Sequence, residues 1–125
     1  MSELFDVVVM DVKGVISHRD TKYCVCVSNL QNKYLFINTD HRTMYDDFEI
    51  KAEDYIFLNN KNRFIACSTI FSINPDRMIR NVGKLNIEDV KKIIDKIIKS
   101  RTISKIDKDS VLPELESWLS GYAMV

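Results

Sequence analysis

The segment from Arg63 to Ser100 constrains the fold more than any other part of the chain. Its first part, residues 63–73 (RFIACSTIFSI), has the β-branched and aromatic composition of a strand. Pro75 ends that strand, because proline has no N–H to donate to a central ladder. The segment therefore predicts a strand, a sharp break, a short basic stretch and then one amphipathic helix.

The helix near residues 86–100 has clear start and packing signals. Asn86 is a favoured N-cap residue, and Asp89 lies three positions later, as in a capping box. The apolar residues that follow have the spacing of one buried helical face: Val90, Ile93, Ile94, Ile97 and Ile98. We therefore expect this helix to pack against, and close, one side of a β-sheet.

The first half of the chain contains further β-rich segments separated by polar turns and loops. These candidate strands cover residues 6–12, 23–28 and 34–38, with shorter ones at 48–50 and 55–58. Together with residues 63–73 they predict five to six short strands. Consecutive short strands followed by helices favour a small, strongly bent sheet or barrel.

A second, shorter helix is expected near residues 110–120, with Pro113 in its first turn and Gly121 at its end. The chain of 125 residues is then one α+β domain, mainly β with C-terminal helices. It would consist of an SH3-like barrel core over about 5–73, the helix near 86–100, and a C-terminal extension over 101–125.

Composition excludes several classes of protein. The three cysteines, with an odd count and a CxC spacing, fit neither a disulfide framework nor a zinc site. No apolar run approaches the ~20 residues that span a bilayer, and the N-terminus lacks the features of a secretory signal. No catalytic-triad, HExxH, phosphate-loop or dinucleotide motif is present. We expect a cytoplasmic protein that uses no metal and no cofactor.

Positive charge is concentrated in one part of a chain whose formal net charge is zero. Residues 61–101 carry 10 Lys and Arg against 4 Asp and Glu, whereas residues 1–60 carry 6 against 10. Zero net charge alone would not hold the chain on nucleic acid. The basic segment is either a nucleic-acid contact or an ordinary solvated helix face.

Two polar loops in the first half hold the side chains with the most chemistry. They are SHRDTK (17–22), with His18, Arg19 and Lys22, and TDHRT (39–43), with Thr39, His41 and Arg42. One loop precedes the second strand and the other follows the third, so both can lie at the same end of the sheet. Such a cluster could hold a phosphodiester, because Arg and Lys stabilise phosphate charge, Thr donates a hydrogen bond and His moves a proton. The alternative is two solvated loops of ordinary turn residues.

Four motifs, taken in order, resemble the MazF/PemK toxins of bacterial toxin–antitoxin systems, which share the CcdB/PemK-type fold. FDVVVMDV (5–12), TKYCVCVS (21–28) and YLFINT (34–39) are similar to the first three strands of that family. Residues 67–100 are similar to its ending, which has a strand, a basic break, Gly-Lys-Leu and a capped helix. The resemblance covers most of residues 5–100 and leaves the C-terminal extension without a counterpart.

The resemblance implies a homodimer that cleaves single-stranded RNA without a metal and is held by an antitoxin protein. In the family the 2′-hydroxyl attacks the adjacent phosphate and leaves a cyclic phosphate. Thr39 matches the catalytic Thr that ends the third strand, and Lys22 stands where the family has its catalytic Arg, with Arg19 three residues earlier. The expected RNA contacts are His18, His41, Arg42, Lys61, Arg63, Arg77 and Arg80. Aromatic stacking faces could come from Tyr23, Tyr34, Tyr45 or Phe48.

A second hypothesis is a protein with the same fold that does not cleave RNA. Lys22 retains a positive charge but lacks the bidentate fork with which Arg grips a phosphate. This departure and the zero net charge favour a non-catalytic protein, either an inhibitor of a protein target, as in the gyrase-directed relatives, or a nucleic-acid-binding adaptor. A fold does not decide between these functions.

Overall fold

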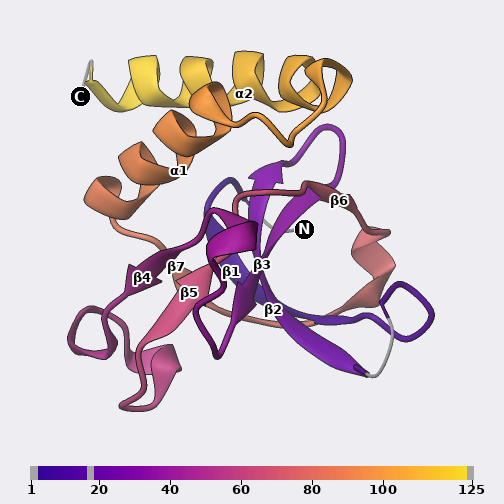
Figure 1. The fold of residues 1–125 in the computed structure, drawn as a ribbon, viewed down its shortest axis with the longest axis vertical. Helices are drawn as coiled ribbons and strands as arrows, with labels where there is room; N and C mark the ends of the chain where they lie inside the picture. Colours follow the sequence, from indigo (N-terminus) through magenta and orange to yellow (C-terminus); the bar gives the residue numbers. More distant parts are fainter. Residues whose placement is uncertain (1–2, 17–18, 124–125) are drawn as a thin grey trace.

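The protein is an antiparallel β-sheet covered on one side by two helices (Figure 1). The computed structural model describes residues 3–16 and 19–123. The sheet contains strands β1 (Asp6–Asp11), β2 (Thr21–Ser28), β3 (Lys33–Asn38), β4 (Phe48–Ile50), β5 (Arg63–Ile65), β6 (Phe71–Ser72) and β7 (Met78–Lys84). The helices are α1 (Ile87–Lys99) and α2 (Lys105–Ala123). This arrangement confirms the predicted α+β class.

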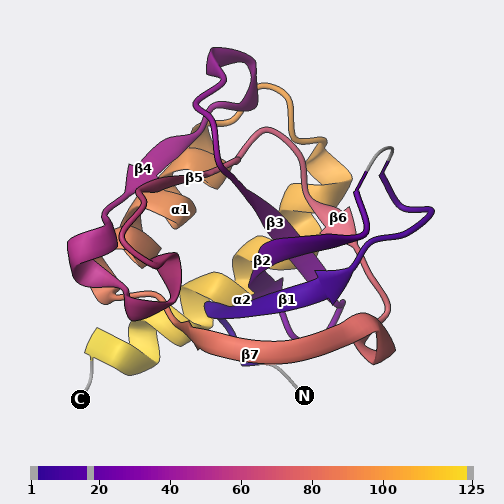
Figure 2. The same cartoon turned by 90° about the horizontal axis from the view of Figure 1, so that it is seen from below.

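The strands follow the order β4-β5-β3-β2-β1-β7, and β6 pairs separately with β3 (Figure 2). The first three strands form consecutive antiparallel pairs, with Val7 opposite Val25 and Val25 opposite Leu35. Strands β4 and β7 stand at the two ends of this order, and no ladder joins them in the described part of the chain. Closure into a barrel therefore stays a prediction.

The prediction of five to six strands missed one strand of the seven-stranded sheet. The stretch 78–84, expected to be a basic break, forms β7 beside β1. It was missed because β7 is an edge strand that is exposed or half-buried along its whole length. Its pairing with β1 shifts register twice, so its apolar residues do not alternate regularly.

Two other predicted strands also differ. The segment 63–73 is divided into β5 and β6, because the backbone N–H of Cys67 donates to the carbonyl of Tyr45 at 3.0 Å and leaves the ladder. Residues Ile56–Leu58 form a short 3-10 helix in place of a strand. The division of the long strand creates the gap in which the candidate site lies.

The alternation of β2 and β3 gives the sheet two apolar faces. Val25, Val27, Leu35 and Ile37 lie in the larger core, together with both helices. Cys24, Cys26, Tyr34 and Phe36 lie in a second cluster on the opposite face. Successive side chains of a strand point to opposite faces, so each strand contributes to both cores. All three cysteines are buried, and none of them forms a disulfide within the described residues.

Helix α1 begins and ends where its sequence predicts. Asn86 accepts a hydrogen bond from the N–H of Asp89 at 2.9 Å, which caps the helix. The Tyr55 hydroxyl donates to the Asp89 carboxylate at 2.5 Å and accepts from the N–H of Asn86 at 3.0 Å. Of the expected buried face, only Ile98 departs, with 48% of its surface exposed.

Helix α2 is longer than the predicted helix near 110–120. It begins after Ser104, whose hydroxyl accepts from the N–H of Asp107 at 3.1 Å, as an N-cap does. Pro113 and Gly121 both lie inside the helix. The packing of α2 outweighs these unfavourable residues, because Val111 and Leu115 are fully buried against the larger core. No helix in residues 3–16 and 19–123 is long and apolar enough to cross a membrane.

Candidate functional site

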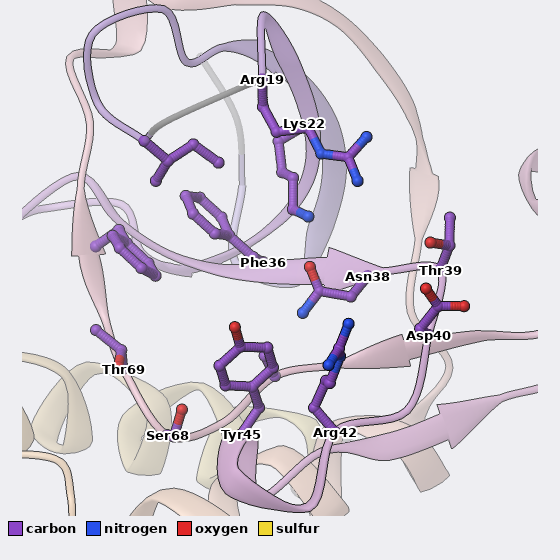
Figure 3. Close-up of a pocket in the computed structure, with 13 residues that line it drawn as sticks. Arg19, Lys22, Phe36, Asn38, Thr39, Asp40, Arg42, Tyr45, Ser68 and Thr69 are labelled. Carbon is purple, nitrogen blue, oxygen red and sulfur yellow. The ribbon is translucent and has the colours of Figure 1, made fainter.

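A pocket of about 360 Å³ opens between the start of β2, the end of β3 and the two segments that follow β3 and β5 (Figure 3). Its walls combine cations, aromatic rings, hydroxyls and one amide. The lining residues are Ile16, Arg19, Lys22, Phe36, Asn38, Thr39, Asp40, Arg42, Tyr45, Ala66, Ser68, Thr69 and Phe71. The pocket therefore brings together four of the six residues that the two polar loops were expected to cluster: Arg19, Lys22, Thr39 and Arg42.

Strand register places Lys22 and Asn38 on the same side of the sheet. Tyr23 pairs with Ile37 across β2 and β3, so Lys22 stands opposite Asn38 at the next position. Both share the face of Cys24 and Phe36, which is the face away from the helices. The Lys22 ammonium lies 5.8 Å from the centre of the Phe36 ring, within the range of a cation–π contact.

The loop after β3 carries Thr39, Asp40, Arg42 and Tyr45, and Asp47 holds it in place. The Asp47 carboxylate is fully buried. One of its oxygens lies 2.5 Å from His41 Nδ1, and the other accepts the backbone N–H of Arg42 at 2.9 Å. Because a single carboxylate binds two loop positions, the loop has a defined shape around the pocket.

A second set of contacts fixes the end of this loop. Asp46 has a left-handed backbone with φ of 46°, and its carboxylate accepts a hydrogen bond from Lys96 of α1 at 2.9 Å. The carbonyl of Tyr45 accepts the N–H of Cys67 at 3.0 Å. These contacts position the Tyr45 side chain, which points into the pocket (Figure 3).

The pocket carries positive charge that its own residues leave uncompensated. Arg19, Lys22 and Arg42 line it, against the single carboxylate of Asp40. In the described ranges, the Arg19, Lys22 and Arg42 side chains make no hydrogen bond or ion pair with another side chain. Burial lowers the pKa of Lys22 below its usual range, and the nearby Arg19 charge lowers it further. An anion in the pocket would offset this repulsion.

Several predicted RNA contacts lie outside the pocket. His41 faces away from it toward Asp47, and its ring lies 5.6 Å from that of Phe64. Arg63 lies over the Tyr23 ring at 5.1 Å, and Lys61 is exposed in the preceding turn. His18 lies outside the described residues.

The two arginines near β7 also lie away from the pocket. Arg77 donates to the carbonyls of Asp11 and Lys13 at 3.2 and 2.9 Å, so it holds the chain after β1. Arg80 is exposed on β7, opposite Val9, at the far edge of the sheet from β5. RNA that contacts these two residues would therefore have to extend beyond the pocket.

The sequence analysis missed most of the uncharged wall of the pocket. Asn38, Ser68 and Thr69 were not named, and Tyr45 was named only as one of several stacking candidates. Asn38 could have been found by alternation, because it ends β3 two residues after Phe36 and so shares its face. Ser68 and Thr69 had no such signal, since they reach the pocket only because the chain leaves the ladder after β5.

This set of side chains can bind a phosphodiester and take part in acid–base chemistry on it. Guanidinium and ammonium groups bind phosphate oxygens, and a threonine hydroxyl can donate to them. A lysine with a lowered pKa can exchange a proton nearer to neutral pH than an ordinary lysine. In the described part of the chain, no group of three His, Cys, Asp or Glu residues could hold a metal ion.

Comparison with known proteins identifies the fold. No family model and no curated protein sequence matches the chain. Among solved structures, the chain is similar to the toxin MazF-mt6 of Mycobacterium tuberculosis, with a TM-score of 0.58. The match covers 74% of this chain and 91% of that one, at 13% sequence identity. This likeness shows that the chain has the fold of the MazF/PemK-type toxins.

Proposed function

We propose that the protein is a metal-independent endoribonuclease that cleaves single-stranded RNA. The observation that carries the proposal is the convergence of Arg19, Lys22, Thr39 and Arg42 on one uncompensated cationic pocket. Two of these residues precede or begin β2, and two follow β3, so antiparallel pairing brings them together. The MazF-type fold supports the same proposal, and Thr39 and Lys22 are the residues for which the motif resemblance implies a catalytic role.

The reaction needs one proton removed and one supplied. The RNA 2′-hydroxyl attacks the adjacent phosphorus, the 2′-O–P bond forms, and the P–O5′ bond breaks. The products are a 2′,3′-cyclic phosphate and a 5′-hydroxyl. Lys22, whose pKa burial lowers, would take the proton of the 2′-hydroxyl in its neutral form. Water would supply the proton that the departing 5′-oxygen takes up.

The other pocket residues would stabilise the charge that develops on the phosphate. Arg19 and Arg42 present guanidinium groups from opposite sides of the pocket (Figure 3). Their charges are unpaired by other side chains in the described residues, so they are available to the two non-bridging oxygens. The Thr39 hydroxyl would donate to one of these oxygens. Removing one such donor typically costs about 100- to 1,000-fold in rate.

Cleavage of RNA in the presence of a chelator tests the proposal. Wild-type protein should release fragments that end in a cyclic phosphate from at least one of several single-stranded RNAs. Thr39→Ala and Lys22→Ala should lose most of this activity. Thr21→Ala and Lys105→Ala are the matched controls, since both residues are exposed and line no part of the pocket. Absence of cleavage by wild type across all RNAs, or full activity of both pocket variants, would reject the proposal.

The remaining features of the proposal concern partners and assembly. RNA would continue from the pocket past His41, Arg63 and Lys61, which lie on or beside β5. The proposal also includes a closed barrel, a homodimer, a cytoplasmic location and an antitoxin that covers the pocket. Sedimentation of the purified protein measures its mass in solution, and a monomer at all concentrations would reject the homodimer.

Binding without cleavage is the second candidate function. It is favoured by Lys22, because an ammonium holds a phosphate as a point charge and lacks the fork of an arginine. Wild-type protein would then bind RNA and leave it intact. Lys22→Arg distinguishes the two, because an arginine stays protonated and cannot act as the base: it should abolish cleavage if the pocket is catalytic, and it should keep or strengthen RNA binding in either case.

A further inference from the structure

The inner wall of the pocket is larger and more apolar than phosphate binding requires. The three cations that could bind a phosphate occupy only part of the wall: Arg19 and Lys22 lie on one side, and Arg42 lies on the loop after β3. Apart from the Asp40 carboxylate, the rest of the wall is aromatic or uncharged, and includes Phe36, Phe71 and Tyr45. A volume of about 360 Å³ falls within the range of small-molecule pockets, roughly 300–1,000 Å³. The unused wall fits a flat ligand with a polar edge.

Tyr45 offers the accessible ring face in this wall. Phe36 and Phe71 stack on each other, with centroids 4.0 Å apart and planes inclined by 10°. Phe36 is buried, whereas 39% of the Tyr45 surface is exposed. Tyr45 is the last residue of a short 3-10 helix, and its carbonyl accepts the N–H of Cys67, so its ring is positioned before any ligand arrives. A rigid aromatic ring of this kind stacks with any nucleobase.

Asn38 supplies the polar group beside that ring. Its amide points into the pocket between Lys22 and Arg42 (Figure 3). The side chain is half-buried, and it makes no hydrogen bond with any residue in the described ranges. An asparagine amide presents a donor and an acceptor side by side, and it must be satisfied by water or a ligand.

We propose that the pocket holds one nucleobase next to the reacting phosphate, stacked on Tyr45 and read by the Asn38 amide. Adenine is the expected base, because an asparagine amide pairs bidentately with its N6 and N7 atoms. The edges of single-stranded RNA bases are free for such readout. The inference rests on the proposed function, in which RNA enters this pocket. It goes further by naming Asn38 as the residue that selects the base at the cleavage site.

Binding of single nucleotides to the full chain tests this without any cleavage. The ligands are inorganic phosphate and the four nucleoside 3′-monophosphates with a 2′-O-methyl group, which cannot be attacked. Their dissociation constants are measured by NMR titration. The adenine nucleotide should bind roughly tenfold more tightly than inorganic phosphate, as expected when a base stacks on an aromatic ring. It should also bind roughly tenfold more tightly than the next nucleotide.

Variants separate the two parts of the site. Tyr45→Ala should remove the gain over inorganic phosphate for all four nucleotides, and Asn38→Ala should remove only the ranking among them. Asn38→Asp should move the preference from adenine toward cytosine, because a carboxylate accepts from the cytosine amino group and repels adenine N7. Tyr122→Ala and Asn29→Ala are controls with side chains outside the pocket, and both should match wild type.

Specific results would overturn the inference. These are equal affinity for inorganic phosphate and all nucleotides, a wild-type ranking led by another base, or an unchanged ranking in Asn38→Ala. Heteronuclear NMR spectra of each variant show whether it is folded, and Asn38→Ser serves as a milder replacement if Asn38→Ala is not. A protein that ranks nucleotides but cleaves no RNA would reject the proposed function alone, whereas cleavage without a ranking would reject this inference alone.

Discussion

Glu114 fastens helix α2 to the turn between β2 and β3. Its carboxylate accepts the Ser28 hydroxyl at 2.7 Å and the backbone N–H of Asn29 at 2.9 Å. A third contact, from the N–H of Leu30, is longer at 3.4 Å. Ser28 is fully buried, so water cannot replace the carboxylate at its hydroxyl. This contact attaches the C-terminal extension to the part of the chain that resembles the MazF-type toxins.

Glu114→Gln should therefore destabilise the protein. Glutamine can offer its one acceptor oxygen to the N–H of Asn29 only by turning its NH₂ group toward Ser28, so the buried Ser28 hydroxyl loses its charged acceptor and both short hydrogen bonds lose the charge. A hydrogen bond to a charged group contributes about 1.5–3 kcal/mol. For a chain of this length, that loss lowers Tm by on the order of 5–12 °C. The temperature of unfolding is measured by circular dichroism at pH 7.

Glu116→Gln is the matched control, because Glu116 is exposed on the same helix and its substitution should change stability by no more than about 0.5 kcal/mol. Phosphate binding should be unchanged in both variants, since the turn lies at the opposite end of β2 and β3 from the pocket. Equal unfolding temperatures for the two variants would refute the reasoning that the carboxylate stabilises this turn.

Three further predictions concern the pocket and the core. Asp47→Asn should lower the free energy of unfolding by about 1–2 kcal/mol, because the hydrogen bond from the backbone N–H of Arg42 loses its charged acceptor. Asp40→Asn is the control and should leave the free energy of unfolding unchanged. Urea denaturation compares the two variants, and equal midpoints would contradict the role of Asp47. The pKa of Lys22 is lowered, so the folded protein releases this proton before the unfolded chain does, and stability rises with pH toward 10.5. Lys22→Met should therefore be more stable than wild type at pH 7, with a difference in unfolding free energy that shrinks as pH approaches 10.5; a constant difference would count against the shift. Burial raises the pKa of Cys24 and Cys67 to about 12, so iodoacetamide at pH 8 should label them only after unfolding, as mass spectrometry would show, and rapid labelling of the native protein would argue against their burial.

The elements that could be predicted from sequence are those whose signals are local. Helix α1 was predicted from its cap at Asn86 and from the spacing of its apolar residues. Both signals involve residues that are close together in the sequence. Strands β1, β2 and β3 were found from short β-rich runs between polar turns. Their order in the sheet followed because consecutive antiparallel strands pair as neighbours.

The errors occurred where distant packing overrides local preference. Strand β7 is exposed or half-buried along its whole length and lacks a regular apolar alternation, so its pairing with β1 makes it a strand. Helix α2 continues through Pro113 because Val111 and Leu115 are buried on the larger core. Ser104 and Asp107 form a local N-cap signal at the true start of the helix. The start was instead predicted near residue 110, because Pro113 was expected to lie in the first turn.

The candidate site divides in the same way. The sequence by itself determined the fold class, the capped helix and the prediction that the loops with Arg19, Lys22, Thr39 and Arg42 could meet, because strand alternation and hairpin pairing follow from the order of residues. Only the tertiary structure decided that Tyr45 and Asn38 share a pocket with them. That proximity depends on Asp47 and Cys67 holding the loop after β3 in one shape, and such contacts between distant segments leave no periodic pattern in the sequence.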